Sequence, residues 1–178
     1  PMNLPHSPFD PTPRSVNRSN KDGNQNFLDM VAYMDHCVGR IEDTLIELGL
    51  RENTLMIFTA DNGTSSSLTL DFFGTERKGG PGSTHDHGTK VPLIVNLPGR
   101  IKVGQVNKDL ICFSDLFPTI VEAANLPAKK ITQADGWSFW PQCLGKVGKK
   151  REWIYGYYFP RPFSKQFDMK YSHWEVAW

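Results

Sequence analysis

The chain has 178 residues, a length that suits one domain or a piece of one, and 39% of its residues are hydrophobic. Its 20 basic and 19 acidic residues give a formal net charge of +1 and form no stripe that could follow a phosphate backbone, so we expect no nucleic-acid partner. No apolar run approaches the roughly 18 residues of a membrane span. We therefore expect a globular, loop-rich protein without a membrane span.

The chain opens on an extended segment and a helix. Residues 1–26 are rich in proline and polar residues, which favours a loop. Apolar residues then recur at steps of three and four from Phe27 to Leu48, which predicts an amphipathic helix ended by Gly49. Residues 54–60, TLMIFTA, are nearly all apolar and predict a buried strand.

A long polar stretch separates this strand from the next. Residues 63–90 are rich in serine and glycine and too long for an ordinary connection, which favours a functional loop. Residues 91–96, VPLIVN, predict a second buried strand, and residues 110–113 predict a short third one. Ser114 is a suitable N-cap for a helix that ends near Asn125.

Strands that alternate with helices predict an α/β fold, here part of a mixed, mostly parallel sheet flanked by helices. In such folds, ligands bind beyond the carboxyl ends of the strands. The aromatic residues between Trp137 and Tyr158 are interpreted as core, with a sugar-binding surface as the alternative.

Asp61 and Asn62 directly follow the strand at residues 54–60, so a carboxylate and an amide oxygen can converge on one ion at its carboxyl edge. Oxygen ligands suit a hard cation such as Ca²⁺ or Mg²⁺, although two of them are too few. The alternative is a plain turn, because Asn-Gly is common turn chemistry.

Two histidine motifs are further candidates. His6 lies between prolines that stiffen its loop, so its ring can be presented to a substrate at a fixed angle. His85, Asp86 and His87 could bind zinc or relay protons, but this short pattern lacks a closed ligand set, and its role stays open.

Several motifs together resemble one family, the sulfatases of the alkaline phosphatase superfamily. The similarity covers residues 5 to about 158 and rests on PHSPFDPTP, MDHCVGRIEDTLIELGLRENTLMIFTADNG, GTKVPLIVNLPG, SDLFPTIVEAANLP and DGWSFWPQCLG. The resemblance implies an alkaline phosphatase-like fold. Residues 1–135 would be the C-terminal half of the catalytic α/β domain, and residues 136–178 a linker and the start of a smaller C-terminal subdomain.

The resemblance also implies roles for three residues. Asp61 and Asn62 would be cation ligands, calcium in most members or else magnesium. His6 would be catalytic, contacting the ester oxygen near the departing alcohol. The parent protein would be a sulfuric ester hydrolase acting on a sulfated small molecule or glycan, and the family is exported to periplasm, lysosome or the extracellular space.

The family's nucleophile is a formylglycine made from a C/S-x-P-x-R motif, which no segment of this chain matches. Two further aspartate ligands belong to the same N-terminal portion of the family. We therefore expect this stretch to need the missing N-terminal half of the same protein and to be inactive alone.

One departure from the family falls at its active-site lysine, where this chain has Pro81. Lys78 could reach the same space because a lysine stem is long. Two alternatives to a sulfatase stay open: a phosphodiesterase or phosphonate hydrolase of the same superfamily, and a non-catalytic relic.

Overall fold

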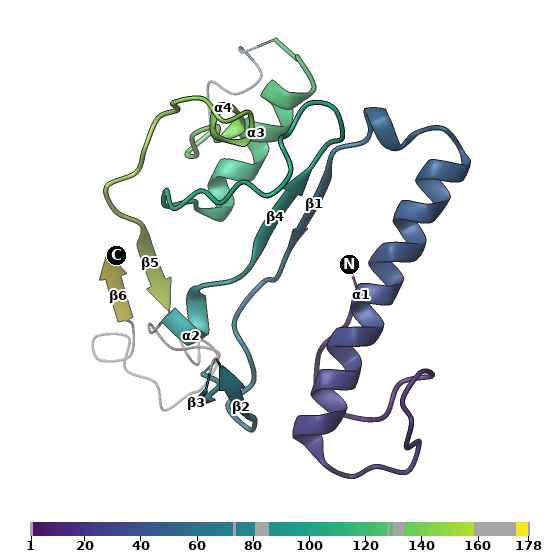
Figure 1. The fold of residues 1–178 in the computed structure, drawn as a ribbon. Coiled ribbons are helices and arrows are strands. Elements are labelled where there is room, and N and C mark those ends of the chain that lie inside the picture. Colours follow the sequence, from purple (N-terminus) through teal and green to yellow (C-terminus); the bar gives the residue numbers. More distant parts are fainter. Residues whose placement is uncertain are drawn as a thin grey trace. The chain divides into compact units, whose positions relative to one another are not determined.

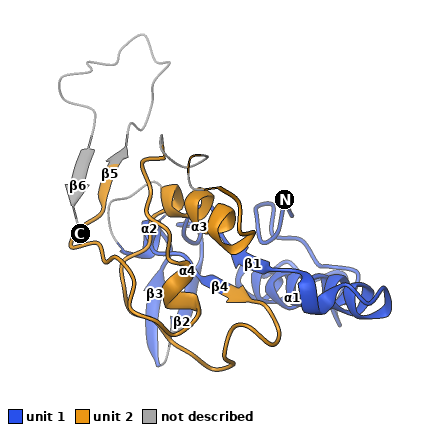
Figure 2. Cartoon of the chain, turned by 90° about the horizontal axis from the view of Figure 1, so that it is seen from above, with its two compact units in different colours: residues 1–94 blue, residues 95–178 orange. Residues whose placement is uncertain are grey.

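The computed structural model of the chain describes residues 2–72, 74–80, 86–127, 129, 134–158 and 174–177. The chain divides into two compact units, Pro1–Ile94 and Val95–Trp178, which Figure 2 shows in different colours. The division falls within strand β4 (Leu93–Asn96). The predicted domain boundary at residue 135 concerns parts of a longer protein and stays a prediction.

Helix α1 (Gly23–Glu47) is the long helix of unit 1 in Figure 1. It begins earlier than predicted because Asp22 caps it: Asp22 Oδ1 accepts a hydrogen bond from the Asn24 N–H at 3.0 Å. Gly49 follows the helix with a φ of 67°, so its predicted role as the left-handed stop is confirmed.

The apolar face of α1 is covered only in part. Phe27 and Met30 are buried, whereas Ile41 and Leu48 are 52% and 65% exposed. The first turns of the helix therefore carry the packing of unit 1, and the last turns present apolar side chains to solvent.

Strand β1 (Met56–Thr59) follows a 3-10 turn at Arg51–Asn53 and pairs with β4 in a two-stranded sheet. Both strands are shorter than the strands predicted at residues 54–60 and 91–96, but they lie inside those ranges. The sequence pattern therefore located both strands.

The stretch predicted as one long loop, residues 63–90, contains regular structure. Strands β2 (Thr69–Phe72) and β3 (Thr75–Lys78) form an antiparallel hairpin, with Thr69 opposite Lys78. A short helix, α2 (Asp86–Thr89), precedes β4. The prediction that this whole stretch is loop was wrong, because its short strands are mostly polar and carry no apolar signal. That the stretch is functional stays a prediction.

Unit 2 begins with irregular chain and a helix. Leu110 makes one isolated antiparallel bridge with Arg151 where a strand was predicted at residues 110–113. Helix α3 (Leu116–Ala123) follows a 3-10 turn at Phe113–Asp115. The predicted N-cap, Ser114, is inside that turn.

The rest of unit 2 contains helix α4 (Trp140–Cys143) and an antiparallel pair of strands, β5 (Tyr155–Tyr158) and β6 (Trp174–Ala177). Trp140 is 4% exposed, as expected of a core aromatic residue, whereas Trp153 is 59% exposed. The aromatic cluster is thus core in one part and surface in another.

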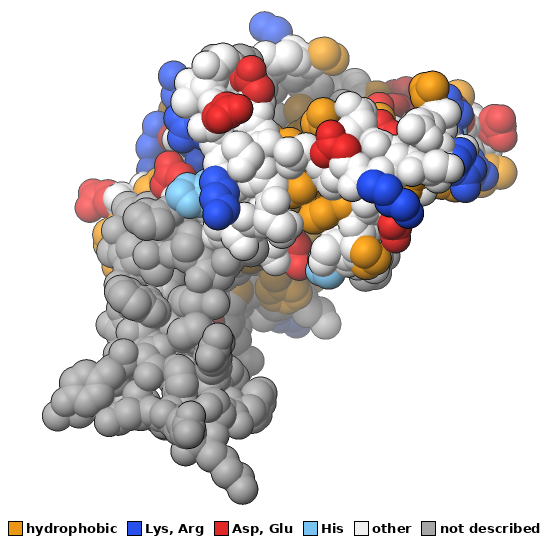
Figure 3. Space-filling view, turned by 90° about the horizontal axis from the view of Figure 1, so that it is seen from below, with side chains coloured by type: hydrophobic (Ala, Val, Ile, Leu, Met, Phe, Trp, Pro, Cys, Tyr) orange, Lys and Arg blue, Asp and Glu red, His pale blue; other side chains and the backbone are white. Residues whose placement is uncertain are grey.

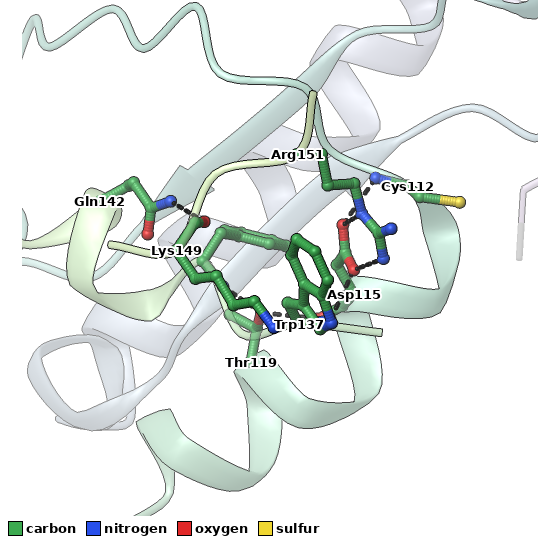
Figure 4. Close-up of polar contacts among 8 residues, drawn as sticks. Cys112, Asp115, Thr119, Trp137, Gln142, Lys149 and Arg151 are labelled. Carbon is green, nitrogen blue, oxygen red and sulfur yellow. Dashed lines mark hydrogen bonds and ion pairs between the residues drawn. The ribbon is translucent and has the colours of Figure 1, made fainter. Parts of the chain in front are cut away.

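A buried carboxylate organises unit 2 (Figure 4). Asp115 is 1% exposed and accepts hydrogen bonds from the backbone N–H groups of Cys112 and Trp137, at 2.8 and 2.7 Å. Arg151 donates to both carboxylate oxygens, through Nε at 3.0 Å and Nη2 at 2.5 Å. Next to this pair, Thr119 accepts a hydrogen bond from the Phe139 N–H at 3.0 Å, which joins α3 to the chain before α4.

The described strands form three two-stranded sheets. Two of them are hairpin-like antiparallel pairs between neighbours in sequence, and the predicted mostly parallel sheet is not seen among the described residues. Parallel strands need long crossover connections, whereas β2 and β3 follow each other closely in sequence and pair antiparallel.

None of the helices in the described ranges combines the length and the apolarity that crossing a membrane requires. On the face shown in Figure 3, basic and acidic side chains are interspersed, in keeping with the nearly balanced charge of the chain.

Candidate active site

Asp61 and Asn62 follow β1 and are exposed at its end. The Asn62 N–H donates to Asp61 Oδ1 at 3.0 Å, and Asn62 Nδ2 donates to the Gly63 carbonyl at 2.8 Å. With its amide nitrogen held by the backbone, Asn62 has Oδ1 as its atom for a cation. The two side chains therefore offer hard oxygen ligands from adjacent positions of one turn.

This turn is anchored to α2 through glycine. The Gly63 N–H donates to the Gly88 carbonyl at 3.0 Å. A Cβ atom at Gly63 would lie 2.0 Å from the His87 carbonyl oxygen, so only glycine allows the two backbones to approach this closely. The position of Asp61 and Asn62 is therefore fixed against the segment that leads into β4.

The β2–β3 hairpin is fixed to the segment that follows this turn. The Gly79 N–H donates to the carbonyl of Leu68, a residue only 2% exposed, at 3.1 Å. A Cβ atom at Gly79 would lie 2.1 Å from the Ser65 carbonyl oxygen. Lys78, which directly precedes Gly79, is exposed. The hairpin thus brings a cationic side chain to the segment that follows Asp61 and Asn62.

His6 is exposed, and its Nδ1 donates to the Ser7 carbonyl at 2.6 Å. This bond orients the ring and occupies Nδ1, so any proton transfer to a ligand would pass through Nε2. The loop is held by α1: Asn26 Nδ2 donates to the Phe9 carbonyl at 2.9 Å, and the Phe9 and Phe27 rings meet edge to face at 5.9 Å. His6 is therefore presented from a fixed loop.

An open hollow of about 310 Å³ adjoins His6 and is lined by the N-terminal loop and α1. Asp61 and Asn62 are not among its lining residues. Within the described residues, the structure therefore places His6 and the Asp61–Asn62 pair in unit 1 but in separate surroundings.

No group of three or more histidine, cysteine, aspartate or glutamate residues that could hold a metal occurs in the described ranges. Asp86 and His87 are in α2, whereas His85 and Pro81 lie outside the described residues. The donor set of Asp61 and Asn62 fits Ca²⁺ or Mg²⁺ in ligand type, and the remaining oxygens must come from elsewhere.

Sequence reasoning missed the residues that hold these segments together. Asn26 is 1% exposed and binds the His6 loop, and Asn24 Oδ1 accepts a hydrogen bond from the Thr69 N–H at 3.2 Å. From sequence alone, polar residues in the first turn of a helix are usually expected to be exposed to solvent. A buried asparagine shows no sequence signal that separates it from an exposed one.

Comparison with known proteins identifies the class. The sulfatase family profile matches residues 3–126, and a second profile, described as N-sulphoglucosamine sulphohydrolase, C-terminal, matches residues 83–175. The chain belongs to the sulfatase family of the alkaline phosphatase superfamily.

Individual relatives agree with this assignment. The chain is 32% identical to the uncharacterized sulfatase YdeN of Escherichia coli over 163 residues, covering 87% of this chain and 29% of YdeN. It is 32% identical to human arylsulfatase A over 139 residues, covering 77% of this chain and 27% of that enzyme. The chain thus spans less than a third of the length of these curated relatives.

A solved structure shows the same fold. The crystal structure of Ps i-CgsB in complex with k-i-k-neocarrahexaose matches with a TM-score of 0.71 and 28% identity. The match covers 88% of this chain and 35% of that one. The fold is therefore a sulfatase fold, although the strands described here include only small sheets.

Proposed function

We propose that the chain contributes a cation site and a proton donor to a sulfatase that hydrolyses sulfate monoesters. The observation that carries this proposal is the turn after β1, where Asp61 and Asn62 are exposed and fixed by the hydrogen bond from Gly63 to Gly88. Membership of the sulfatase family supports it.

Asp61 and Asn62 would hold Ca²⁺ or Mg²⁺, together with oxygen ligands from another part of the protein. When bound, the cation would draw charge from the sulfate oxygens and make the sulfur more electrophilic. The nucleophile, formylglycine in this family, would come from a segment other than this chain. The carboxylate of Asp61 supplies the negative charge that makes the turn selective for a cation.

His6 would protonate the departing alcohol. As the bond between sulfur and the ester oxygen breaks, that oxygen gains negative charge and takes the Nε2 proton of His6 in its imidazolium form, which leaves a neutral ring with its remaining proton on Nδ1. The bond from Nδ1 to the Ser7 carbonyl keeps the ring in one orientation, so the proton is delivered from a fixed position. His6 loses one proton in this step and regains it from solvent afterwards.

Exchanging Asp61 for alanine in the longest polypeptide encoded in the same reading frame should reduce the kcat/KM for an aryl sulfate by about 10³-fold, because the cation loses its charged ligand. Release of 4-nitrophenol from 4-nitrophenyl sulfate, with calcium or with a chelator, measures the effect. Asp43→Ala, which changes an exposed aspartate of α1, is the matched control and should retain full activity.

The same assay with 4-nitrophenyl phosphate and a phosphodiester separates the remaining alternatives. Faster, cation-dependent release from a phosphate ester would replace the sulfatase proposal by a phosphoesterase. Release from neither ester by the correctly folded parent protein would favour the non-catalytic relic.

Lys78 is proposed to contact a sulfate oxygen in place of the family lysine, since Pro81 carries no charge. We expect Lys78→Ala to lower kcat/KM for aryl sulfate about 10²-fold and Lys78→Arg to retain more activity, because the charge remains. Lys102→Ala, an exposed lysine of unit 2, serves as the control. Equal activity of Lys78→Ala and Lys102→Ala would exclude this role.

For the substrate class, we propose a sulfated glycan or small sugar. Ps i-CgsB, one of the solved structures that this chain resembles, was crystallised in complex with k-i-k-neocarrahexaose. Turnover of a sulfated hexose by the parent protein, measured beside 4-nitrophenyl sulfate, tests this substrate class.

A further inference from the structure

Unit 2 carries an excess of positive charge that the nearly neutral total conceals. Residues 95–178 contain 12 basic and 7 acidic residues, a formal net charge of +5. Residues 1–94 contain 8 basic and 12 acidic residues, a formal net charge of −4. Such an asymmetry along one chain favours an anionic partner for the basic part.

Two irregular segments of unit 2 lie side by side: the first lysine loop, residues 102–108, and the second lysine loop, residues 145–150. Gln105 Nε2 in the first loop donates to the carbonyl of Cys143, just before the second loop, at 3.2 Å. A Cβ atom at Gly145 would lie 2.9 Å from Gln105 Oε1. The isolated antiparallel bridge of unit 2 joins the chain just beyond both loops. The two loops therefore form one surface.

Both loops present valine side chains to solvent. Val103 and Val106 in the first loop are 89% and 85% exposed, and Val147 in the second loop is 92% exposed. Side chains that are exposed to this extent contribute no packing to unit 2. The free energy of burying them is therefore available to a partner.

The same loops contain lysines and no acidic residue. The lysines, all of them exposed, are Lys102, Lys108, Lys146, Lys149 and Lys150. Lys150 forms an ion pair with Asp109 at 2.9 Å. Lys149 Nζ lies over the Trp137 ring, 3.5 Å from its centre (Figure 4). The other three form no ion pair within the described part of the chain, so most of the positive charge is not neutralised.

The chemistry of the two loops fits a lipid surface better than a patterned polyanion. All their cations are lysines, which act as point charges and suit a fluid array of headgroups. Arginine is the usual residue for bidentate recognition of sulfate or phosphate groups on a sugar chain or a nucleic acid. Exposed valines gain nothing from such polar polymers, but they are stabilised in the apolar layer beneath lipid headgroups.

We propose that the two lysine loops form a docking surface for an anionic lipid bilayer. The lysines contact the lipid phosphates, and Val103, Val106 and Val147 enter the boundary between the headgroups and the acyl chains. A few basic and apolar side chains that act together give reversible binding at the surface, not a membrane span. The inference concerns unit 2 alone and does not depend on the proposed sulfatase function.

The test measures sedimentation of the full-length parent protein with vesicles of phosphatidylcholine that contain about one quarter phosphatidylglycerol. Wild type is expected to bind these vesicles, to leave pure phosphatidylcholine vesicles unbound, and to dissociate when NaCl is raised to about 0.5 M. Lys102→Gln combined with Lys146→Gln should lower the partition constant about 25-fold, fivefold for each lysine. Val103→Ser combined with Val147→Ser should lower it at least about tenfold and keep the salt dependence.

The matched controls are Lys21→Gln and Val16→Ser, which change exposed residues of unit 1 and should bind the vesicles as wild type does. Equal binding by the loop variants and these controls would overturn the proposal, as would equal binding to neutral vesicles or none to either kind. Binding of heparin or RNA without binding of vesicles would assign the loops to a dissolved polyanion instead. A lower urea midpoint for the valine double variant would show that the rest of the protein covers these side chains, which also contradicts the proposal.

Discussion

Asp115→Ala is expected to lower the free energy of unfolding by about 3–5 kcal/mol, the usual cost of removing one partner of a buried ion pair. The substitution leaves the Arg151 guanidinium and the N–H groups of Cys112 and Trp137 without their acceptor. Urea unfolding of the parent protein, followed by circular dichroism, measures the loss.

The control for this substitution is Glu122→Ala, which removes an exposed carboxylate from α3 and should change stability by less than about 0.5 kcal/mol. Combining Asp115→Ala with Arg151→Met should cost less than the two single changes added together, because neither partner is then left buried alone. Strict additivity would show that the pair contributes nothing through mutual contact.

The same carboxylate predicts a pH dependence. Burial alone raises the pKa of Asp115, but the hydrogen bonds from Arg151, Cys112 and Trp137 outweigh it and hold the pKa below its ordinary value of 3.8. The folded state therefore stabilises the charged carboxylate of Asp115. This contribution to stability is fully present above the pKa of the unfolded state and is lost as the pH falls through the lower pKa of the folded state. Asp115→Asn should therefore flatten the decline in stability below about pH 4.

Asn26→Ala is expected to cost about 3 kcal/mol, since a buried side chain loses three hydrogen bonds and two carbonyls lose their donor. Asn26 Nδ2 donates to the carbonyls of Phe9 and Asn20, at 2.9 and 3.1 Å, and its Oδ1 accepts from Asn20 Nδ2 at 3.1 Å. The urea midpoint should fall, and aryl sulfate activity should decrease even where the protein is still folded, because the His6 loop is released.

Gln25→Ala is the neighbouring control, because Gln25 is exposed and its side chain donates to Asp29 within the same helix at 2.9 Å. It should leave both the midpoint and the activity near wild type. A fall in stability without any change in kcat for Asn26→Ala would contradict a role of this residue in presenting His6.

Local patterns predicted some elements well. The three-and-four spacing located α1, and the apolar runs located β1 and β4, because burial leaves a direct signal in composition. The start of α1 was missed because a capping aspartate, not apolar spacing, defines it. The β2–β3 hairpin was missed because its strands are short and polar.

The candidate site shows the same limit. Adjacent residues such as Asp61 and Asn62 can be assigned to one local site from sequence alone, and in the structure they are joined by local hydrogen bonds. Contacts between segments far apart in sequence, such as Asn24 with Thr69 or Asp115 with Arg151, depend on tertiary packing. No spacing rule for one chain reveals which distant polar residue will be buried beside another.

The first turn of α1 is hydrogen-bonded to two segments that carry candidate site residues. Asn26 contacts the loop of His6, and Asn24 contacts the hairpin that ends in Lys78. Two flexible loops that were positioned independently would each add their own error to the separation of their side chains. Here both segments are hydrogen-bonded to the same rigid helical turn, so the separation of their side chains varies less than it would between two independent loops.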